Sequence, residues 1–237
     1  MATTRLSIEQ ALLLEGCQWR YGLRYVQRIV RPRTMLMAVR QCYIDSCITA
    51  ISEKLDCTAH TSLFIDLWRQ AITTAHGGYK NSSKLPQVAR GNLLALHCMA
   101  LKASIPELDW TRGTTRVTSF GEVEIEWAPH LEAGNAAILF VPAGPARAQD
   151  ISRSLQVVLL TPEFENIYVV YLRVNTVCVR VYNGRTTNGV CRIMQKRIAA
   201  LHRYLLRGMM VRSSPANDEC SPLWCEYFTG CPKGSDE

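Results

Sequence analysis

The sequence lacks any uninterrupted apolar stretch of the about 18 residues that a membrane-spanning helix needs. Its longest candidate, Met35 to Ile51, is broken by Arg40, Gln41 and Asp45. The opening segment, MATTRLSIEQ, has neither the apolar core nor the small-residue cleavage site of a secretory signal. We therefore expect a soluble, intracellular protein with no membrane partner. In such a protein the ten cysteines are thiols or metal ligands before they are disulfides.

Common catalytic signatures are missing as well. No GxGxxG, GxxxxGK[ST], GxSxG or HExxH motif occurs, which argues against dinucleotide-binding, P-loop, serine-hydrolase and zinc-peptidase chemistry. The histidines are not paired at ligand spacing; they are His60, His76, His97, His130 and His202. Proline and glycine are sparse, at 10 and 14 of 237 residues, and 48% of the residues are hydrophobic. This composition predicts one folded domain with a large core.

Basic residues outnumber acidic residues, by 27 to 20, and the formal net charge is +7. Arginine outnumbers lysine in the first forty residues, and its forked guanidinium suits phosphate groups. Two basic stripes recur at helical spacing: Arg20, Arg24, Arg28 and Arg31, and then Arg192, Lys196, Arg203 and Arg207. Tyr21, Tyr25 and Tyr204 lie among them. We expect the stripes to contact phosphates and unpaired bases of nucleic acid, with solvated helix faces as the alternative.

The first 105 residues read as a helical part. Ser7 and Gln10 form a capping box, which predicts that a helix begins there. The arginine-rich stretch that follows predicts a second helix, which Pro32 ends. Apolar residues at a period of 3.6 predict a long core helix over 34–55, with further helices over about 62–75 and through 93–99 and an exposed loop at 76–83.

Beyond Pro106 the pattern changes to that of strands. Val117 to Trp127 alternates with the period of a half-buried strand, with Glu122, Glu124 and Glu126 on the other face. The remaining predicted elements are a buried strand at 136–141, a helix at 150–160, a hairpin of 166–174 and 177–182, and a helix at 190–208. The order predicts an α/β (α+β) fold, with a central mixed β-sheet flanked by helices.

The last residues hold three closely spaced cysteines. The run CSPLWCEYFTGC contains Cys220, Cys225 and Cys231. Thiolates at such spacing suit zinc or an iron–sulfur cluster, but both take four sulfur ligands. The alternative is three reduced thiols in the chain's tail. Cys17 stands apart from the other cysteines, in the aromatic and basic segment GCQWRYGLRYV.

A capped helix, a cysteine followed by aromatic and basic residues, a long helix, a β region and a C-terminal cysteine triplet together resemble the RecB-type iron–sulfur branch of the PD-(D/E)XK nucleases. This branch includes the CRISPR-adaptation exonucleases. The resemblance implies that Cys17, Cys220, Cys225 and Cys231 hold a [4Fe-4S] cluster, with structural zinc or no metal as alternatives. The first gap of the triplet is four residues here, where the family usually has two. The resemblance divides the single domain into a helical part (1–105), a sheet-containing core (106–208) and a tail (209–237) that closes back onto the N-terminal helix.

The same resemblance implies where a nuclease site stands, and the residues there are degenerate. Cys42 (or Gln41) takes the place of the family's helix histidine, Glu124 that of its aspartate, Phe140 that of its second carboxylate and Pro142 that of its lysine, while Gln156 is retained. Phosphodiester hydrolysis in this family needs two acidic groups on a divalent cation and a lysine near the attacking water. We therefore expect no hydrolysis.

These observations predict a catalytically inactive nuclease-like protein, which acts as a nucleic-acid-binding or architectural subunit of a DNA-processing complex. DNA is expected in preference to RNA. One alternative is a protein-interaction module that docks a helicase, polymerase or nuclease through Trp110, Trp127 or Trp224. Another is a divergent but active metal-dependent DNA exonuclease, in which Glu126 or Asp150 supplies the second carboxylate. A viral or mobile-element origin is compatible with this degree of divergence.

Overall fold

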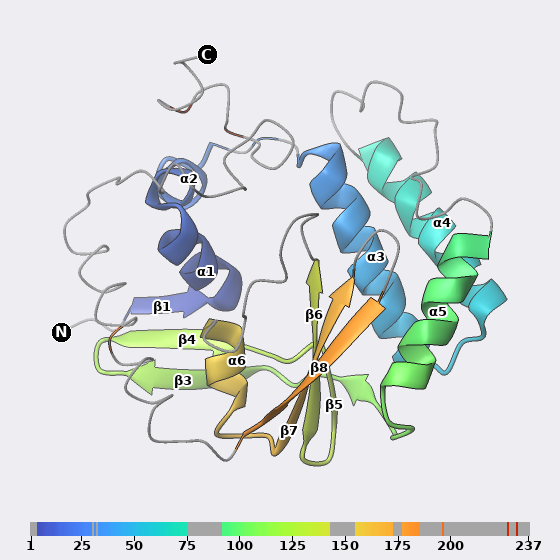
Figure 1. Cartoon of the computed structure of the whole chain (residues 1–237). Helices are drawn as coiled ribbons and strands as arrows, with labels where there is room; N and C mark the ends of the chain where they lie inside the picture. The colour runs from blue at the N-terminus through green and yellow to red at the C-terminus, as the bar shows by residue number, and fades with distance from the viewer. Residues whose placement is uncertain are drawn as a thin grey trace. The chain divides into compact units, whose positions relative to one another are not determined.

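The computed structural model describes residues 4–29, 31, 33–74, 92–142, 155–172 and 177–184, together with Lys196, Tyr227 and Cys231. These residues form an α+β fold with two mixed sheets and flanking helices (Figure 1). The predicted fold class is confirmed, with the strands divided between two sheets. The chain separates into two compact units: Met1–Leu36, Thr115–Trp127 and Asn188–Glu237 form the first, and Met37–Thr114 and Ala128–Thr187 the second.

None of the helices in the described part of the chain is long and apolar enough to cross a membrane.

The first unit contains a three-stranded sheet in the order β1-β4-β3 (Thr4–Ser7, Val123–Trp127 and Arg116–Phe120). Strand β1 runs parallel to β4, and β3 runs antiparallel to it. The single strand predicted over 117–127 is therefore a hairpin. Its turn is Gly121–Glu122, and Gly121 has a φ of +63°, which glycine adopts without a steric penalty.

Two helical segments and a π-helix follow β1. Helix α1 (Ile8–Gly16) begins as predicted, because the Ser7 and Gln10 side chains cap each other's backbone N–H groups at 2.8 and 3.2 Å. Helix α2 (Gln18–Tyr21) continues into the π-helix η1 (Gly22–Val26). The predicted helix through Arg31 is thus shorter than expected: it ends at Val26, and Arg28 takes a left-handed φ of +56°.

The second unit contains a five-stranded sheet in the order β2-β5-β6-β7-β8 (Thr111–Arg112, Leu131–Ala133, Ala136–Pro142, Asn166–Leu172 and Val177–Asn183). Strands β6 and β7 are parallel, and the other pairs are antiparallel. The predicted buried strand at 136–141 is β6, and the predicted hairpin is β7–β8. Helix α6 (Leu155–Leu160) accounts for the described part of the helix expected at 150–160.

Three helices stand together beside this sheet (Figure 1): α3 (Met35–Ser52), α4 (Cys57–Thr74) and α5 (Asn92–Ser104). Cys47, Phe64 and Leu94, one from each helix, share a buried cluster with Ile138 and Phe140 of β6. The long helix and the helix through 93–99 are confirmed. Helix α4 starts earlier than predicted. The loop at 76–83, nearly all of the helix at 190–208 and most of the cysteine tail lie outside the described residues.

Candidate functional site

Phe140 occupies the position where the resemblance places a metal-binding carboxylate. Its side chain is 2% exposed and belongs to the apolar core of the second unit. Its backbone N–H donates a hydrogen bond of 2.8 Å to Nδ1 of His130, and the two rings lie 5.8 Å apart between centroids. An apolar ring in an apolar core has no donor for a cation. The position is therefore part of the hydrophobic core.

Of the other degenerate positions in the second unit, one is buried, one is half-buried and one ends a strand. Cys42 lies on α3 with 7% of its surface exposed, and it belongs to the same core cluster as Phe140. Gln156 is half-buried on α6, where it is surrounded in sequence by buried apolar residues. Pro142 ends β6 opposite Leu172 of β7. None of these three residues supplies a carboxylate or an amine.

Glu124 lies on β4 in the first unit, whereas Phe140 and Pro142 lie on β6 in the second. The positions that the resemblance assigns to one nuclease site therefore belong to different units. Its carboxylate accepts a hydrogen bond of 3.4 Å from the Ser119 hydroxyl across the hairpin. Glu126, the alternative second carboxylate, forms an ion pair of 2.9 Å with Arg5 of the neighbouring strand β1. Among the described residues, no three His, Cys, Asp or Glu side chains are grouped so as to hold a metal ion. Asp150 lies outside those residues.

Cys17 is the N-cap residue of α2. Its half-buried thiol accepts the Arg20 backbone N–H at 3.5 Å. Cys231 is a second half-buried free thiol of the same unit, and Cys220 and Cys225 lie outside the described residues. The four-cysteine ligand set therefore stays a prediction.

One described residue of the C-terminal segment contacts the N-terminal segment. The buried Tyr227 donates a hydrogen bond of 2.5 Å from its hydroxyl to the Ile29 carbonyl. The guanidinium of Arg31 lies 5.8 Å from the centre of the Tyr227 ring. Tyr227 comes two residues after Cys225 in the sequence, and Cys231 follows it by four. The contact therefore joins Tyr227, from the cysteine-rich segment, to the residues that follow η1.

The arginines of the first basic stripe differ in exposure and in the contacts that they make. Arg24 is 26% exposed and forms an ion pair of 3.1 Å with Glu9 of α1. Its guanidinium also lies 5.4 Å from the centre of the Tyr25 ring, which in turn lies 5.3 Å from that of Tyr21. Arg28, by contrast, is exposed beyond the end of the helical segment. The stripe is therefore not one helix face, because only its first two arginines are helical.

The solvent-facing arginines of this region are Arg28, Arg31 and Arg33, which we call the arginine segment. Half-buried Tyr21 and Tyr25 precede it. Burial raises the pKa of both phenols above the usual value, so both rings are neutral at pH 7. Of the second basic stripe, the structure describes Lys196, which is exposed. Arg192, Arg203 and Arg207 lie outside the described residues.

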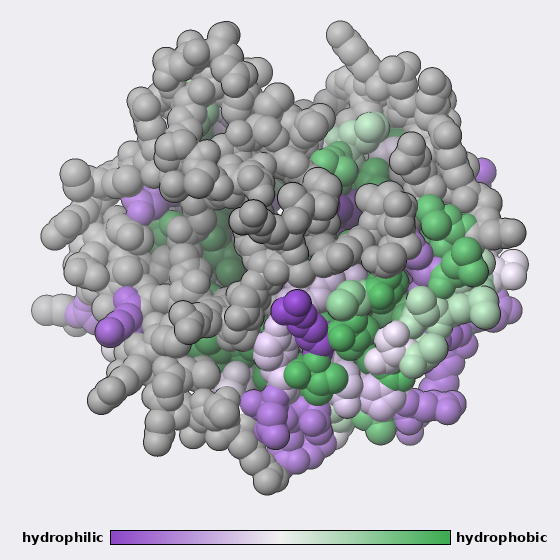
Figure 2. Space-filling view, in the orientation of Figure 1, coloured by the Kyte–Doolittle hydropathy of each residue, from purple (hydrophilic) through white to green (hydrophobic). Residues whose placement is uncertain are grey.

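Two of the three tryptophan anchors expected for an interaction module, Trp110 and Trp127, are buried. Trp110 is 5% exposed and its indole N–H donates to the Pro106 carbonyl at 3.0 Å, while Trp127 is 4% exposed and donates to Thr118 at 2.8 Å. Trp224 lies outside the described residues. Large aromatic side chains complete cores more often than they remain on surfaces. The most exposed large apolar side chains are Val26 in the first unit and Leu96, Met99 and Val181 in the second, each more than half exposed. Figure 2 shows apolar surface over α5 and β8.

Sequence reasoning missed a buried polar cluster among α3, α4 and α5. The Tyr43 hydroxyl and His97 Nδ1 lie 2.8 Å apart, and Ser46 Oγ and His60 Nε2 lie 3.1 Å apart. Ser46 donates its proton to the Tyr43 carbonyl at 2.9 Å, so His60 Nε2 is the donor in their hydrogen bond. Burial, aided by the positive charge of Lys102, lowers the pKa of His60 to about 4. The pairings join residues far apart in sequence, so spacing along the chain gives no signal of them.

A scan against protein-family models finds no match, and a search of the curated proteins finds none either. Among solved structures, the chain is similar to a "Putative exonuclease" from Eubacterium rectale, with a TM-score of 0.55 and 9% identity over 91% of this chain and 86% of that one. It is also similar to the protein SSO0001, with a TM-score of 0.47 and 12% identity over 99% of this chain and 89% of that one. The likeness to the Eubacterium rectale protein shows a shared fold.

Proposed function

We propose that the chain is a nucleic-acid-binding protein on an exonuclease-like fold that has lost its hydrolytic metal site. Its role is that of an architectural subunit in a DNA-processing complex. The buried Phe140 is the observation that supports the loss of hydrolysis most directly. The fold shared with the Eubacterium rectale protein named "Putative exonuclease" supports the nuclease-like ancestry. The arginine segment supports binding to a polyanion.

Loss of hydrolysis follows from the energetics of the Phe140 position. A carboxylate at that position would lie in an apolar core, where an unpaired charge costs several kcal/mol. The polar atom that contacts the Phe140 backbone, His130 Nδ1, already accepts the Phe140 N–H. Burial also lowers the pKa of His130 to about 4, so its ring is neutral at pH 7 and provides no counter-charge. A metal-binding pair of carboxylates therefore has no place at this strand.

Binding follows from the chemistry of the arginine segment. The guanidinium groups of Arg28, Arg31 and Arg33 match phosphate oxygens and release counterions when they bind a nucleic-acid backbone. Tyr21 and Tyr25 offer neutral aromatic rings beside them, on which unpaired bases can stack. Single-stranded DNA is therefore the preferred ligand, because its bases are free to reach these rings.

The proposal is tested by binding at several salt concentrations to labelled single-stranded DNA, double-stranded DNA and RNA of the same sequence. Wild-type affinity is expected to fall steeply between about 50 and 200 mM salt. The double variant Arg28→Glu/Arg33→Glu is expected to bind at least about tenfold more weakly, with a salt slope smaller by roughly one unit per arginine. The double variant changes two exposed arginines, whereas Arg24 is mostly buried and pairs with Glu9.

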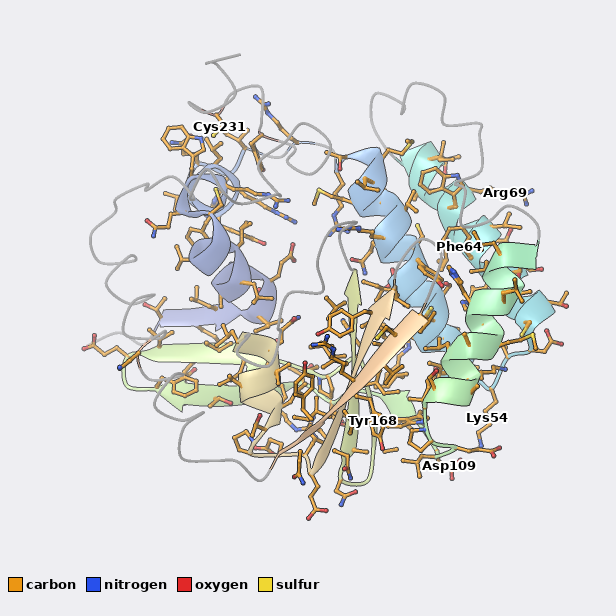
Figure 3. The ribbon with its side chains drawn as sticks, viewed as in Figure 1. Lys54, Phe64, Arg69, Asp109, Tyr168 and Cys231 are labelled. Carbon is orange, nitrogen blue, oxygen red and sulfur yellow. The ribbon has the colours of Figure 1, made fainter. Side chains whose placement is uncertain are left out.

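Arg69→Glu is the matched control for the single variant Arg28→Glu, because both change the net charge by −2, and Arg69 is an exposed arginine on α4 of the other unit (Figure 3). It is expected to lower affinity by less than about twofold, since exposed single charges act weakly when they do not contact the ligand. Equal losses in Arg69→Glu and in Arg28→Glu would show that net charge, and not the arginine segment, governs binding. Unchanged binding in the double variant would end the proposal for this surface.

The loss of hydrolysis needs its own assay. We expect no cleavage of single-stranded or double-stranded DNA by the wild-type protein with Mg²⁺ or Mn²⁺. Metal-dependent cleavage that Glu124→Ala abolishes would instead identify a divergent active exonuclease. Because binding and cleavage are measured separately, failure of one part of the proposal leaves the other testable.

A further inference from the structure

Two cysteines meet where helix α4 begins beside helix α5. Cys57 is the first residue of α4, and Cys98 lies in the middle of α5. The two helices pack directly against each other. Cys57 and Cys98 are close enough that Cys57 raises the pKa of the Cys98 thiol. Cys57 and Cys98 are both free thiols in the structure.

The junction around these thiols is held by polar contacts at both helices. Asp56, immediately before Cys57, caps α4 by accepting the Ala59 backbone N–H at 2.7 Å. Lys102, one turn after Cys98 on α5, donates from its amino group to the Leu55 carbonyl. These contacts fix the start of α4 against the second half of α5. The two thiols are therefore held near each other by the packing of α4 against α5 and by the contacts of Asp56 and Lys102.

The two thiols differ in accessibility. Cys57 is half-buried, whereas Cys98 has 1% of its surface exposed. Burial, and then the neighbouring Cys57, raises the pKa of Cys98 to about 12, while the positive charge of Lys102 opposes the rise and Asp56 adds to it. Burial raises the pKa of Cys47 and of Tyr43 on α3, and the nearby Cys98 raises both further. A small oxidant thus reaches Cys57 before it reaches Cys98.

We propose that Cys57 and Cys98 are a redox modification site, at which a peroxide converts the two thiols into a reversible disulfide. Cys57 sulfur attacks one peroxide oxygen, the O–O bond breaks, and the products are a sulfenic acid on Cys57 and one water. Cys98 sulfur then attacks the Cys57 sulfur and displaces the hydroxyl group, which leaves as a second water with the Cys98 proton. The two sulfurs lose two electrons in total, and the peroxide gains them. The product links the start of α4 to α5.

The pair is better suited to a disulfide than to a metal. Among the described residues, no third Cys, His, Asp or Glu lies so as to complete a metal site with them. A disulfide needs only the two sulfurs and a modest approach of the side chains, because its S–S bond is about 2 Å long. The proposal does not depend on nucleic-acid binding or on the cysteines of the first unit.

The test uses the full-length protein, treated with graded hydrogen peroxide, alkylated, digested without reductant and analysed by mass spectrometry. We expect a peptide pair linked through Cys57 and Cys98, with a mass two hydrogens below the sum of the two thiol peptides. It is expected at a peroxide dose at which Cys178 stays reduced and is therefore still alkylated in the next step. Dithiothreitol is expected to restore both thiols. This measurement on the wild-type chain needs no variant that could fail to fold.

Two serine variants complete the experiment. Cys57→Ser is expected to abolish the linked peptide and to leave Cys98 alkylatable after denaturation. Cys178→Ser, which removes another half-buried thiol, from β8, is expected to leave the linked peptide unchanged. The proposal is overturned if Cys57 is oxidised to sulfinic or sulfonic acid while Cys98 stays reduced, or if Cys57 links to a different cysteine.

Discussion

The Phe140 backbone N–H and the His130 ring are joined by a hydrogen bond of 2.8 Å to Nδ1. Because Nδ1 is the acceptor, the neutral ring carries its proton on Nε2. Protonation of His130 would place a second proton on Nδ1 and break this bond in the interior of the second unit. Burial already lowers the pKa of His130 from 6.5 to about 4, so the folded protein favours the neutral ring.

This relationship predicts how stability depends on pH. Between about pH 6.5 and pH 4 the unfolded chain binds more protons at His130 than the folded chain does, so the free energy of unfolding falls as the pH drops through this window. His60, whose pKa is also lowered to about 4, adds to the same loss. We expect the combined loss to be a few kcal/mol. Urea unfolding at pH 7.5, 6 and 5 measures it.

His130→Asn is the matched variant for this prediction. The Asn amide oxygen can take the place of Nδ1 as the acceptor of the Phe140 N–H, but it does not titrate. The variant is expected to keep the hydrogen bond and to show a shallower loss of stability between pH 6.5 and pH 4 than the wild type. An unchanged pH profile would mean that His130 is not a source of the acid sensitivity.

A second prediction concerns the lost carboxylate. Phe140→Asp restores the residue type of the nuclease motif but places a charge in the apolar core, and is expected to destabilise the protein by about 3–5 kcal/mol. Phe140→Leu keeps an apolar side chain and is expected to cost less, about 1–2 kcal/mol. Urea unfolding compares the two, with a nuclease assay on each. Equal stability of the two variants, or metal-dependent cleavage by Phe140→Asp, would contradict the assignment of this position to the core.

The start of α4 gives a third prediction. The Asp56 carboxylate accepts the Ala59 N–H, so Asp56→Ala removes the cap and is expected to cost about 1 kcal/mol of stability. Asp56→Asn retains an acceptor oxygen and is expected to remain within about 0.5 kcal/mol of the wild type. Thermal and urea unfolding measure both. A loss of the same size in both variants would assign the effect to the negative charge and not to the cap.

The comparison of sequence with structure shows which features are local enough to predict. The capping box of Ser7 and Gln10 was readable because two residues three positions apart make the whole interaction. Asp56 also caps a helix, but it lies six residues before the predicted start of α4 at about 62. The first apolar residues after Asp56 are spaced less regularly than those of α3. Asp56 itself is therefore the main sequence signal that a helix begins at this point.

The alternation of apolar residues continues through the turn between β3 and β4, and it therefore predicts one strand where the structure has a hairpin. Pairing across the two-residue turn places Phe120 opposite Val123 and Thr118 opposite Ile125. Since opposite residues share a face, the inward face of β3 is that of Thr118 and Phe120, and Val117 is 44% exposed. The prediction of a single strand put Val117 and Ser119 on the inward face, whereas the turn at Gly121–Glu122 puts Thr118 and Phe120 there.

The candidate site was predictable in composition and not in geometry. Sequence spacing found the arginines of the first basic stripe, but it placed Arg28 and Arg31 on a helix that ends at Val26. The ion pair of Arg24 with Glu9 was also beyond spacing, because it joins α1 to η1. Which arginines remain available to a ligand depends on such contacts between elements.

The last prediction concerns the four-cysteine set Cys17, Cys220, Cys225 and Cys231. Cys17 and Cys231 are half-buried free thiols of one unit, and Tyr227 bonds the segment between Cys225 and Cys231 to the backbone at Ile29. Four thiolates are a ligand set that suits a [4Fe-4S] cluster and also zinc. We expect the anaerobically purified protein to hold iron and sulfide, and Cys17→Ser to lose both while Cys178→Ser keeps them. Absorption spectra and metal and sulfide quantification decide the matter: zinc in place of iron would keep the four-thiol site but weaken the resemblance to the iron–sulfur nucleases, whereas a metal-free and stably folded protein would return the four cysteines to ordinary thiols.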